Sequence, residues 1–367
     1  MDALVCTSCG RHYCLDEVRW SCECGSLLDI EFEARLDRDR IDAGKPTLWR
    51  YREAIPIGCD SSIVSLGEGF TPLREFKLAG RTVLAKEEYI SPTGSFKDRG
   101  ATVLVSKARE LGISEAVEDT SGNAGAAIAA YCREAGIGLR VFVPSGALPE
   151  KIHRIEEFGA EVKKVKGCRD DCSAAALQAA KRTYYAGHAR NPFFLQGTKT
   201  FAYEICEQLE WKAPDVVVLP AGNGTLLLGT HIGFKDLIAA GLADRMPKLV
   251  GVQAKACAPL FRAFHENLDH VPRVQPADTL ADGIAVGAPA RGSQVIDAVR
   301  ESGGNFFAVD DLEIMAAQRE VAAKGFQIEP TAAAGIAGLA RYLARGEVGD
   351  TVVTALTGRG LKSPVSP

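Results

Sequence analysis

E-Y-I-S-P-T-G-S-F-K-D-R-G, from Glu88 to Gly100, is the stretch of sequence that decides the fold. It follows a short apolar run at residues 82–85 that is typical of a strand, and its proline and first glycine predict a turn. We expect a helix after the turn, with Ser95 as its cap and apolar side chains recurring at helical spacing. Lys97 would then lie in the first helical turn, where the helix dipole disfavours the charged amine and so favours a nucleophilic one. The alternative is an exposed lysine without a chemical role.

Length and composition indicate a globular protein of two lobes, because 367 residues are too many for one small core. The chain is 46% apolar and 25% charged with a net charge of -4, and without a basic run it is not expected to bind nucleic acid. Its longest apolar runs, such as residues 124–130, fall far short of the roughly 18 residues of a membrane span. No signal peptide is expected, and six of the eleven cysteines are scattered between Cys59 and Cys257. We therefore expect a cytoplasmic protein.

The other five cysteines crowd the first 25 residues, and four of them form two pairs, each followed by glycine. Cys6-x-x-Cys9 and Cys22-x-Cys24 predict a zinc-ribbon-like extension over residues 1–36, in which four thiolates hold a structural Zn²⁺ and leave no position for a substrate. The alternatives are an extension with reduced thiols, or a ribbon that binds nucleic acid or protein.

From residue 116 the pattern alternates between strand and helix, which favours a parallel sheet covered on both faces. We expect residues 114–188 to form a smaller, mobile lobe inserted into a larger lobe of residues 37–113 and 189–367. The expected strands are 116–118, 139–143, 161–165, 215–219, 248–253 and 352–356, and the expected helices include 124–134, 149–158, 171–184 and 191–209.

Two turns at the carboxyl ends of predicted strands are candidate ligand sites, because open α/β sheets bind ligands there. T-S-G-N at residues 120–123 has small side chains and helix-start amides that suit an anion. A capped turn is the alternative, although it leaves Asn123 without a role. P-A-G-N-G-T-L at residues 220–226 can cradle phosphate, and it matches neither a dinucleotide fingerprint nor a P-loop. A plain turn between strand and helix remains open for it.

The segment at residues 92–100 resembles the lysine segment of the tryptophan-synthase-β-like, or fold type II, pyridoxal-phosphate enzymes. Within that group it is most similar to the threonine synthases. L-W-R-Y at residues 48–51, S-L-G-E-G-F-T-P-L at 65–73 and T-G-R-G-L-K at 357–362 resemble the same enzymes. The resemblance spans essentially the whole chain, with its motifs in family order. It implies an α/β fold of two doubly wound, sheet-containing lobes with a cleft between them.

The resemblance also implies a role for each site residue. Lys97 would bind the pyridoxal phosphate covalently, and Asn123 would hydrogen-bond the 3′-oxygen of the cofactor. Thr357 would bond the pyridine nitrogen, and as a neutral partner it would leave that nitrogen largely unprotonated. The phosphate group would be bound by Gly222, Asn223, Gly224 and Thr225. The substrate carboxylate would be held by residues drawn from Thr120, Ser121, Gly122 and Ala124.

The expected reaction converts O-phospho-L-homoserine and water to L-threonine and phosphate, in a homodimeric lyase of threonine biosynthesis. The alternative is β-elimination or β-replacement on serine, phosphoserine or diaminopropionate, as in cysteine synthases, cysteate synthases or ammonia-lyases, because T-S-G-N-A-G is closer to the cysteine synthases. Candidate cations for the anionic group of the substrate are Lys86, Lys199 and Arg359, the last standing where the family usually has His.

Overall fold

The structure, a computed structural model, describes residues 2–120, 122–147, 149–167, 169–346 and 349–360. The chain divides into two compact α/β units: unit 1 comprises residues 1–69 and 97–198, and unit 2 comprises residues 70–96 and 199–367. This division differs from the predicted lobes, because residues 37–69, 97–113 and 189–198 group with the smaller sheet. The mobility of the smaller lobe stays a prediction.

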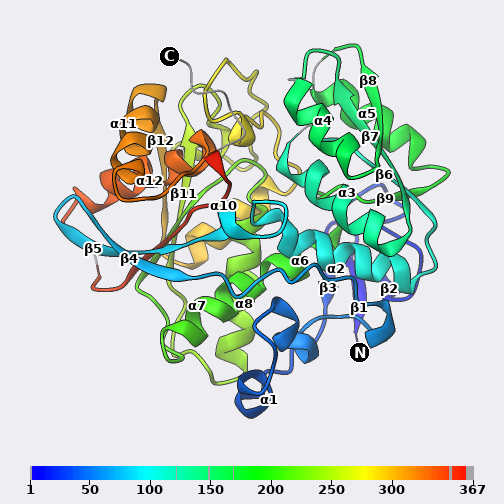
Figure 1. Cartoon of the computed structure of the whole chain (residues 1–367), viewed down its shortest axis with the longest axis horizontal. Helices are drawn as coiled ribbons and strands as arrows, with labels where there is room; N and C mark the ends of the chain where they lie inside the picture. The colour runs from blue at the N-terminus through cyan, green and yellow to red at the C-terminus, as the bar shows by residue number, and fades with distance from the viewer. Residues whose placement is uncertain (1, 121, 148, 168, 347–348, 361–367) are drawn as a thin grey trace. The chain divides into compact units, whose positions relative to one another are not determined.

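Unit 1 contains a sheet of four parallel strands in the order β8-β7-β6-β9 (Figure 1). The predicted helix over residues 171–184 is wrong at its end, because Tyr184 begins a strand that pairs with Ala116. The strands are β6 (Glu115–Glu118), β7 (Gly138–Pro144), β8 (Glu161–Val165) and β9 (Tyr184–Tyr185). The helices are α2 (Lys97–Glu110), α3 (Asn123–Ala135), α4 (Pro149–Glu157), α5 (Arg169–Ala179) and α6 (Pro192–Thr198).

Both faces of this sheet are covered, as the alternation of its buried side chains requires. Ala116 and Val141 belong to the core cluster that contains the apolar side chains of α2 and α3. Val117 and Tyr185, which pair in neighbouring strands, belong to a second cluster with Ala176 of α5. The carboxyl ends of β6 and β9 therefore lie between two packed layers.

The N-terminal residues 2–36, called the ribbon below, form an antiparallel sheet in the order β2-β1-β3. Its strands are β1 (Ala3–Cys6), β2 (His12–Cys14) and β3 (Leu28–Glu31). Leu4, Leu28 and Cys22 are buried in the same core cluster as helices α2 and α3. The ribbon is thus part of the core of unit 1. Helix α1 (Arg38–Asp42) and the 3-10 helices η1 (Leu48–Ala54) and η2 (Asp60–Ser62) follow it.

Unit 2 contains a six-stranded sheet in the order β12-β11-β10-β13-β5-β4, parallel except for β4. The valine-rich strand β10 is buried along its whole length, as expected at the centre of a covered parallel sheet. The strands are β4 (Leu73–Leu78), β5 (Arg81–Lys86), β10 (Val216–Pro220), β11 (Lys248–Ala254), β12 (Asn305–Val309) and β13 (Val352–Ala355). The helices are α7 (Thr200–Gln208), α8 (Thr225–Ala239), α9 (Pro259–His265), α10 (Gly292–Glu301), α11 (Asp311–Ala322) and α12 (Pro330–Leu343), with 3-10 helices η3 (Glu88–Ile90) and η4 (Asp282–Ile284).

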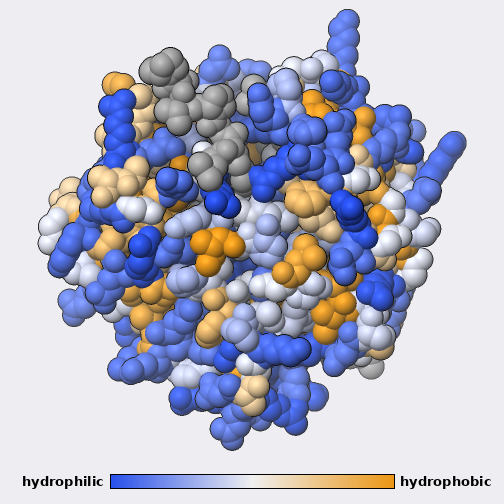
Figure 2. All heavy atoms as spheres, in the orientation of Figure 1, coloured by the Kyte–Doolittle hydropathy of each residue, from blue (hydrophilic) through white to orange (hydrophobic). Residues whose placement is uncertain are grey.

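The predicted helix over residues 191–209 is wrong as a single element, because it is interrupted at Lys199, between α6 and α7. The Lys199 ammonium pairs with Asp236 of α8 at 2.9 Å, a partner that local periodicity cannot indicate. No helix among the described residues is long and apolar enough to cross a membrane. On the face drawn in Figure 2, apolar side chains lie scattered among polar ones, which is ordinary for a protein surface.

Candidate active site

Lys97 is the first residue of α2, which confirms its predicted position at a helix start. Its side chain is half-buried, and its Nζ lies 5.5 Å from the centre of the Phe194 ring of α6. Phe194 is fully buried, and a Cβ added at Gly100 would approach that ring to 2.5 Å. Gly100 therefore lets the ring pack against α2 on the side of the candidate nucleophile.

The segment immediately before Lys97 pairs with residues that follow β13, all within unit 2. Ser95 forms an antiparallel bridge with Gly358, and the Phe96 N–H donates to the Thr357 carbonyl at 3.1 Å. Ser95 Oγ is buried without a hydrogen-bond partner, so its predicted role as the helix cap is wrong. The Thr357 hydroxyl is likewise buried and unpartnered within the described chain. Because such a group costs about 1–3 kcal/mol, a ligand atom that bonds Thr357 would remove the penalty.

The turn at residues 221–224, called the cofactor turn below, joins β10 to α8. Gly224 is the N-cap of α8 with φ of 73°, a conformation that favours glycine, and no side chain caps the helix. A Cβ at Gly222 would lie 3.0 Å from the Ile284 Cα, and one at Gly224 would overlap the Val295 side chain. The turn therefore leaves no room for a side chain at either glycine and presents the backbone amides of a long helix. This donor set fits a phosphate group.

The turn at residues 119–122, called the substrate turn below, joins β6 to α3 in unit 1. Gly122 is the N-cap of α3, and its N–H donates to the Thr120 hydroxyl at 3.2 Å. Asn123 is the first helical residue, and Ala124 behind it is buried. Thr120, Gly122, Asn123 and Ala124 therefore lie at or just before the start of α3, and their roles in binding stay predictions. Ser121 lies outside the described residues.

Comparison with known proteins identifies the family. Residues 64–358 match the family described as "Pyridoxal-phosphate dependent enzyme". The chain is 38% identical to the threonine synthase of Methanocaldococcus jannaschii, over 98% of this chain and 92% of that one. It is 37% identical to the threonine synthase of Mycobacterium tuberculosis, over 86% and 88% of the two chains. The chain belongs to the threonine synthase family of pyridoxal-phosphate-dependent lyases.

Solved structures resemble the chain in fold. Threonine deaminase isoform 2 from Solanum lycopersicum has a TM-score of 0.70 at 23% identity, covering 91% of this chain and 88% of that one. Maize serine racemase has a TM-score of 0.69 at 19% identity, covering 79% and 88%. These likenesses confirm the expected fold type II architecture.

Pyridoxal phosphate is the cofactor of this family, and the residues of each unit fit it when the units are considered separately. Unit 2 offers the enclosed amides of the cofactor turn for a phosphate and the unpaired Thr357 hydroxyl for a ring nitrogen. Unit 1 offers Lys97 at a helix start, above an aromatic ring.

Three residues that support these turns were missed from the sequence. Gln253 is fully buried at the end of β11, donates to the Ala221 carbonyl at 3.0 Å, and accepts from the Phe261 N–H. In unit 1, Glu118 Oε1 and His188 Nδ1 lie 2.8 Å apart and are both buried. The His188 and Phe194 rings in turn form a T-shaped pair, with centroids 5.7 Å apart. A polar side chain at the end of an apolar strand was the available signal for Gln253 and Glu118.

Two of the three candidate substrate cations are wrong, because each is buried and already forms an ion pair with a carboxylate. Lys86 Nζ lies 2.8 Å from Glu204 Oε2, and neither side chain is exposed. Lys199 is similarly committed to Asp236. Arg359 has an exposed side chain, and its backbone N–H donates to the Gly94 carbonyl. Arg359 alone of the three remains a candidate.

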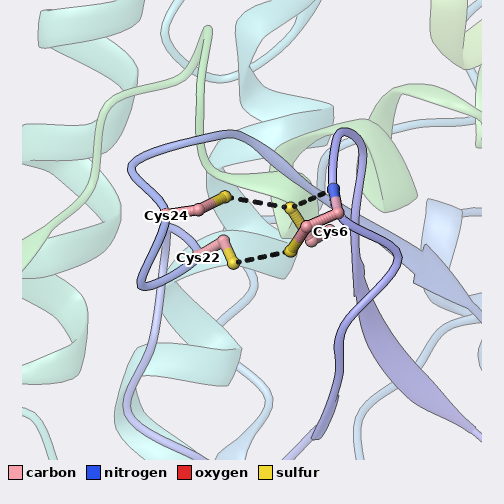
Figure 3. A group of neighbouring side chains, drawn as sticks. Cys6, Cys22 and Cys24 are labelled. Atoms are coloured by element: carbon pink, nitrogen blue, oxygen red, sulfur yellow. Dashed lines mark hydrogen bonds between the residues drawn. The ribbon is translucent and has the colours of Figure 1, made fainter.

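The four predicted metal ligands of the ribbon converge. The sulfur atoms of Cys6, Cys9, Cys22 and Cys24 all lie within 4.8 Å of one another, with Cys6–Cys24 at 3.5 Å and Cys9–Cys22 at 3.6 Å. Figure 3 labels three of the four, Cys6, Cys22 and Cys24. A hydrogen bond from the Tyr13 hydroxyl lowers the pKa of the Cys22 thiol to about 6, which favours a thiolate. Sulfur atoms around tetrahedral Zn²⁺ are about 3.8 Å apart, so this donor set fits the metal.

Proposed function

We propose that this enzyme converts O-phospho-L-homoserine and water to L-threonine and inorganic phosphate, as a step of threonine biosynthesis. The observation that carries this substrate assignment is the 38% identity to a threonine synthase over 98% of the chain. The two turns and Lys97 support it, because they supply the donor types that an amino-acid substrate and a phosphorylated cofactor need.

The proposed residue roles follow the resemblance and the local geometry. Lys97 binds the cofactor, Asn123 bonds its 3′-oxygen, and Thr357 bonds its ring nitrogen. The phosphate group lies on the backbone and side chains of Gly222, Asn223, Gly224 and Thr225. The substrate carboxylate lies on residues of the substrate turn, drawn from Thr120, Ser121, Gly122 and Ala124.

The bound cofactor supplies an electron sink for the carbanion that forms at Cα. The freed amine of Lys97 takes the Cα proton and then transfers protons at Cβ and Cγ. Phosphate leaves from Cγ, which takes up a proton, and the hydroxyl of water adds at Cβ. A proton returns to Cα, and the remaining proton leaves with the phosphate. The helix-start amides of the substrate turn stabilise the carboxylate throughout, because they are fixed before the substrate binds.

The decisive assay measures phosphate release from O-phospho-L-homoserine together with threonine formation. The rival activity would instead release pyruvate or ammonia from serine, phosphoserine or diaminopropionate. The sequence T-S-G-N-A-G favours this rival. Phosphate and threonine in equal amounts support the proposal, whereas ammonia or pyruvate release without threonine would reject it.

We also propose that the ribbon binds one structural Zn²⁺ through Cys6, Cys9, Cys22 and Cys24. Metal analysis should return about one zinc per chain. Cys22→Ser should lose the metal, whereas Cys14→Ser should keep it, because Cys14 is exposed and is absent from the converging group among the described residues. Equal zinc content in both variants would contradict the assignment.

The enzyme is further proposed to act as a homodimer in the cytoplasm, on a small amino-acid substrate and without a nucleic-acid partner. Light scattering on the holoenzyme should give twice the chain mass of 39.2 kDa. A monomer with full activity would contradict the dimer.

A further inference from the structure

One aromatic side chain of the ribbon packs against the sheet of unit 1 on the face that carries α5. Trp20 lies two residues before Cys22, and its ring centre is 4.7 Å from that of Tyr185 in β9, with an interplanar angle of 50°. Trp20 packs with Val117 of β6 and Leu177 of α5 in the same small cluster. The ribbon therefore covers part of the sheet face that also carries α5.

Tyr185 links this contact to the substrate turn. Its side chain is buried, and its hydroxyl donates to the carboxylate of Asp119. Asp119 directly precedes Thr120, the first candidate substrate residue. Burial, together with the charge of Asp119, raises the pKa of Tyr185 well above its ordinary value, so the hydroxyl remains a donor at neutral pH.

A second contact holds the ribbon independently of Trp20. Lys107 of α2 is buried, and its Nζ lies 2.9 Å from Asp16 of the ribbon. Leu4, Leu28 and Cys22 also remain in the core of unit 1. Loss of the Trp20 ring should therefore leave the ribbon attached and change only the contact with Tyr185.

We propose that the ribbon positions the substrate turn through Trp20, Tyr185 and Asp119, which act as positioning residues for substrate binding. The proposal rests on the proposed role of residues 120–124 in holding the substrate. It assigns the ribbon an influence on the affinity for substrate and none on cofactor attachment, because Lys97 contacts a different aromatic ring, that of Phe194. Disturbing the ribbon should thus raise KM while the visible cofactor spectrum stays unchanged.

The first test compares two neighbouring buried tyrosines of β9 in the holoenzyme. Tyr185→Phe removes the hydroxyl that Asp119 accepts, and its KM should rise about tenfold with kcat changed less than about twofold. Tyr184→Phe is the matched control, because the Tyr184 hydroxyl accepts from Asn191 instead. Equal KM values for both variants and the parent would overturn the proposal, as would loss of the cofactor spectrum in Tyr185→Phe alone.

The second test needs no substrate, so it separates failure of this proposal from failure of the proposed reaction. Amide hydrogen exchange of peptides spanning residues 119–125 should be faster in Trp20→Ala than in the parent holoenzyme. Val18→Ala is the control, because Val18 belongs to the same ribbon loop but is 61% exposed. Parent-like exchange at residues 119–125 in Trp20→Ala, with β1 and β2 still protected, would overturn the proposal even if the enzyme acted on another substrate.

Discussion

The substrate turn and the cofactor turn have the same local architecture but different surroundings. Each follows a parallel strand, and each leads into a helix whose N-cap is glycine without a side-chain cap. Around the substrate turn, the nearest atom to an added Cβ at Gly122 is the Thr120 hydroxyl at 4.0 Å. Around the cofactor turn, Ile284 and Val295 leave no such room.

Their polar supports differ as well. The substrate turn begins at Asp119, directly after Glu118, and the carboxylates of Glu118 and Asp119 contact His188 and Tyr185, respectively. The cofactor turn is held by a neutral amide, that of Gln253. The comparison teaches that the turn proposed for a constant ligand group, the cofactor phosphate, is a close-packed cradle of backbone atoms. The turn proposed for the substrate keeps space and ionisable neighbours, which suits a ligand that enters and leaves.

The largest expected effect is a loss of stability and cofactor affinity on substitution of Gly224, one of the two N-cap glycines. Gly224→Ala should lower the free energy of unfolding by about 2–4 kcal/mol, because alanine is strained at positive φ and its methyl group would overlap Val295. Cofactor affinity should fall at least about tenfold in the same variant. Thermal unfolding and titration of the apoenzyme with pyridoxal phosphate measure both.

Gly122→Ala is the matched substitution in the substrate turn. Gly122 has φ of -108° and open space around it, so alanine should change stability by less than about 1 kcal/mol. Cofactor affinity should remain that of the parent. Similar losses in both variants would remove the distinction between a rigid and an open turn.

A smaller effect, with opposite signs for stability and catalysis, is expected at Thr357. Thr357→Val keeps the shape but removes the unpartnered hydroxyl, so the apoenzyme should be unchanged or stabilised by about 1 kcal/mol. The holoenzyme should lose about tenfold in kcat, because the cofactor ring nitrogen would lose its proposed partner. Thr357→Ser should restore kcat. Destabilisation of the apoenzyme by Thr357→Val would mean that the hydroxyl already has a partner.

The smallest expected effect is a pH dependence of stability that arises from His231 in unit 2. Burial of His231 on α8 lowers its pKa below the ordinary 6.5, although the Glu301 carboxylate at 3.1 Å opposes the shift. Because the unfolded chain binds this proton more readily, the stability from neutral His231 is present above about pH 6.5 and is lost as the pH falls toward the folded pKa. The fall in Tm between pH 7.5 and pH 5.5 should be smaller in His231→Gln than in the parent. An equal fall in Tm in the variant and the parent would show that His231 does not contribute to this pH dependence.

Much of the fold was predictable from local pattern. The turn before Lys97 and the parallel strands β6, β7, β8, β10, β11 and β13 follow from apolar runs bounded by glycine and proline. The error at Tyr184 has a simple reason: an aromatic pair at the end of a helical stretch joins β6 only in the folded sheet. The prediction that Ser95 caps the helix failed for a similar reason. Ser95 forms a bridge with Gly358, which lies far along the chain.

The site was predictable wherever glycine or a resemblance marked it, and not where partners are distant in sequence. Lys86 carries no local sign of Glu204, which lies 118 positions away. Glu118 and His188 are separated by 70 positions, and Trp20 is farther still from Tyr185. Side-chain pairs of this kind arise from packing, which the spacing of residues along the chain does not encode.

The measurement that tests the account most directly locates the cofactor on the chain. The purified holoenzyme is treated with borohydride, which fixes a bound pyridoxal phosphate to its lysine, and the peptides are then mapped by mass spectrometry. The account predicts the added mass on Lys97 alone, and a Lys97→Ala variant should carry no label and release no phosphate from O-phospho-L-homoserine. Label on a different lysine, or phosphate release by Lys97→Ala at the parent rate, would contradict it.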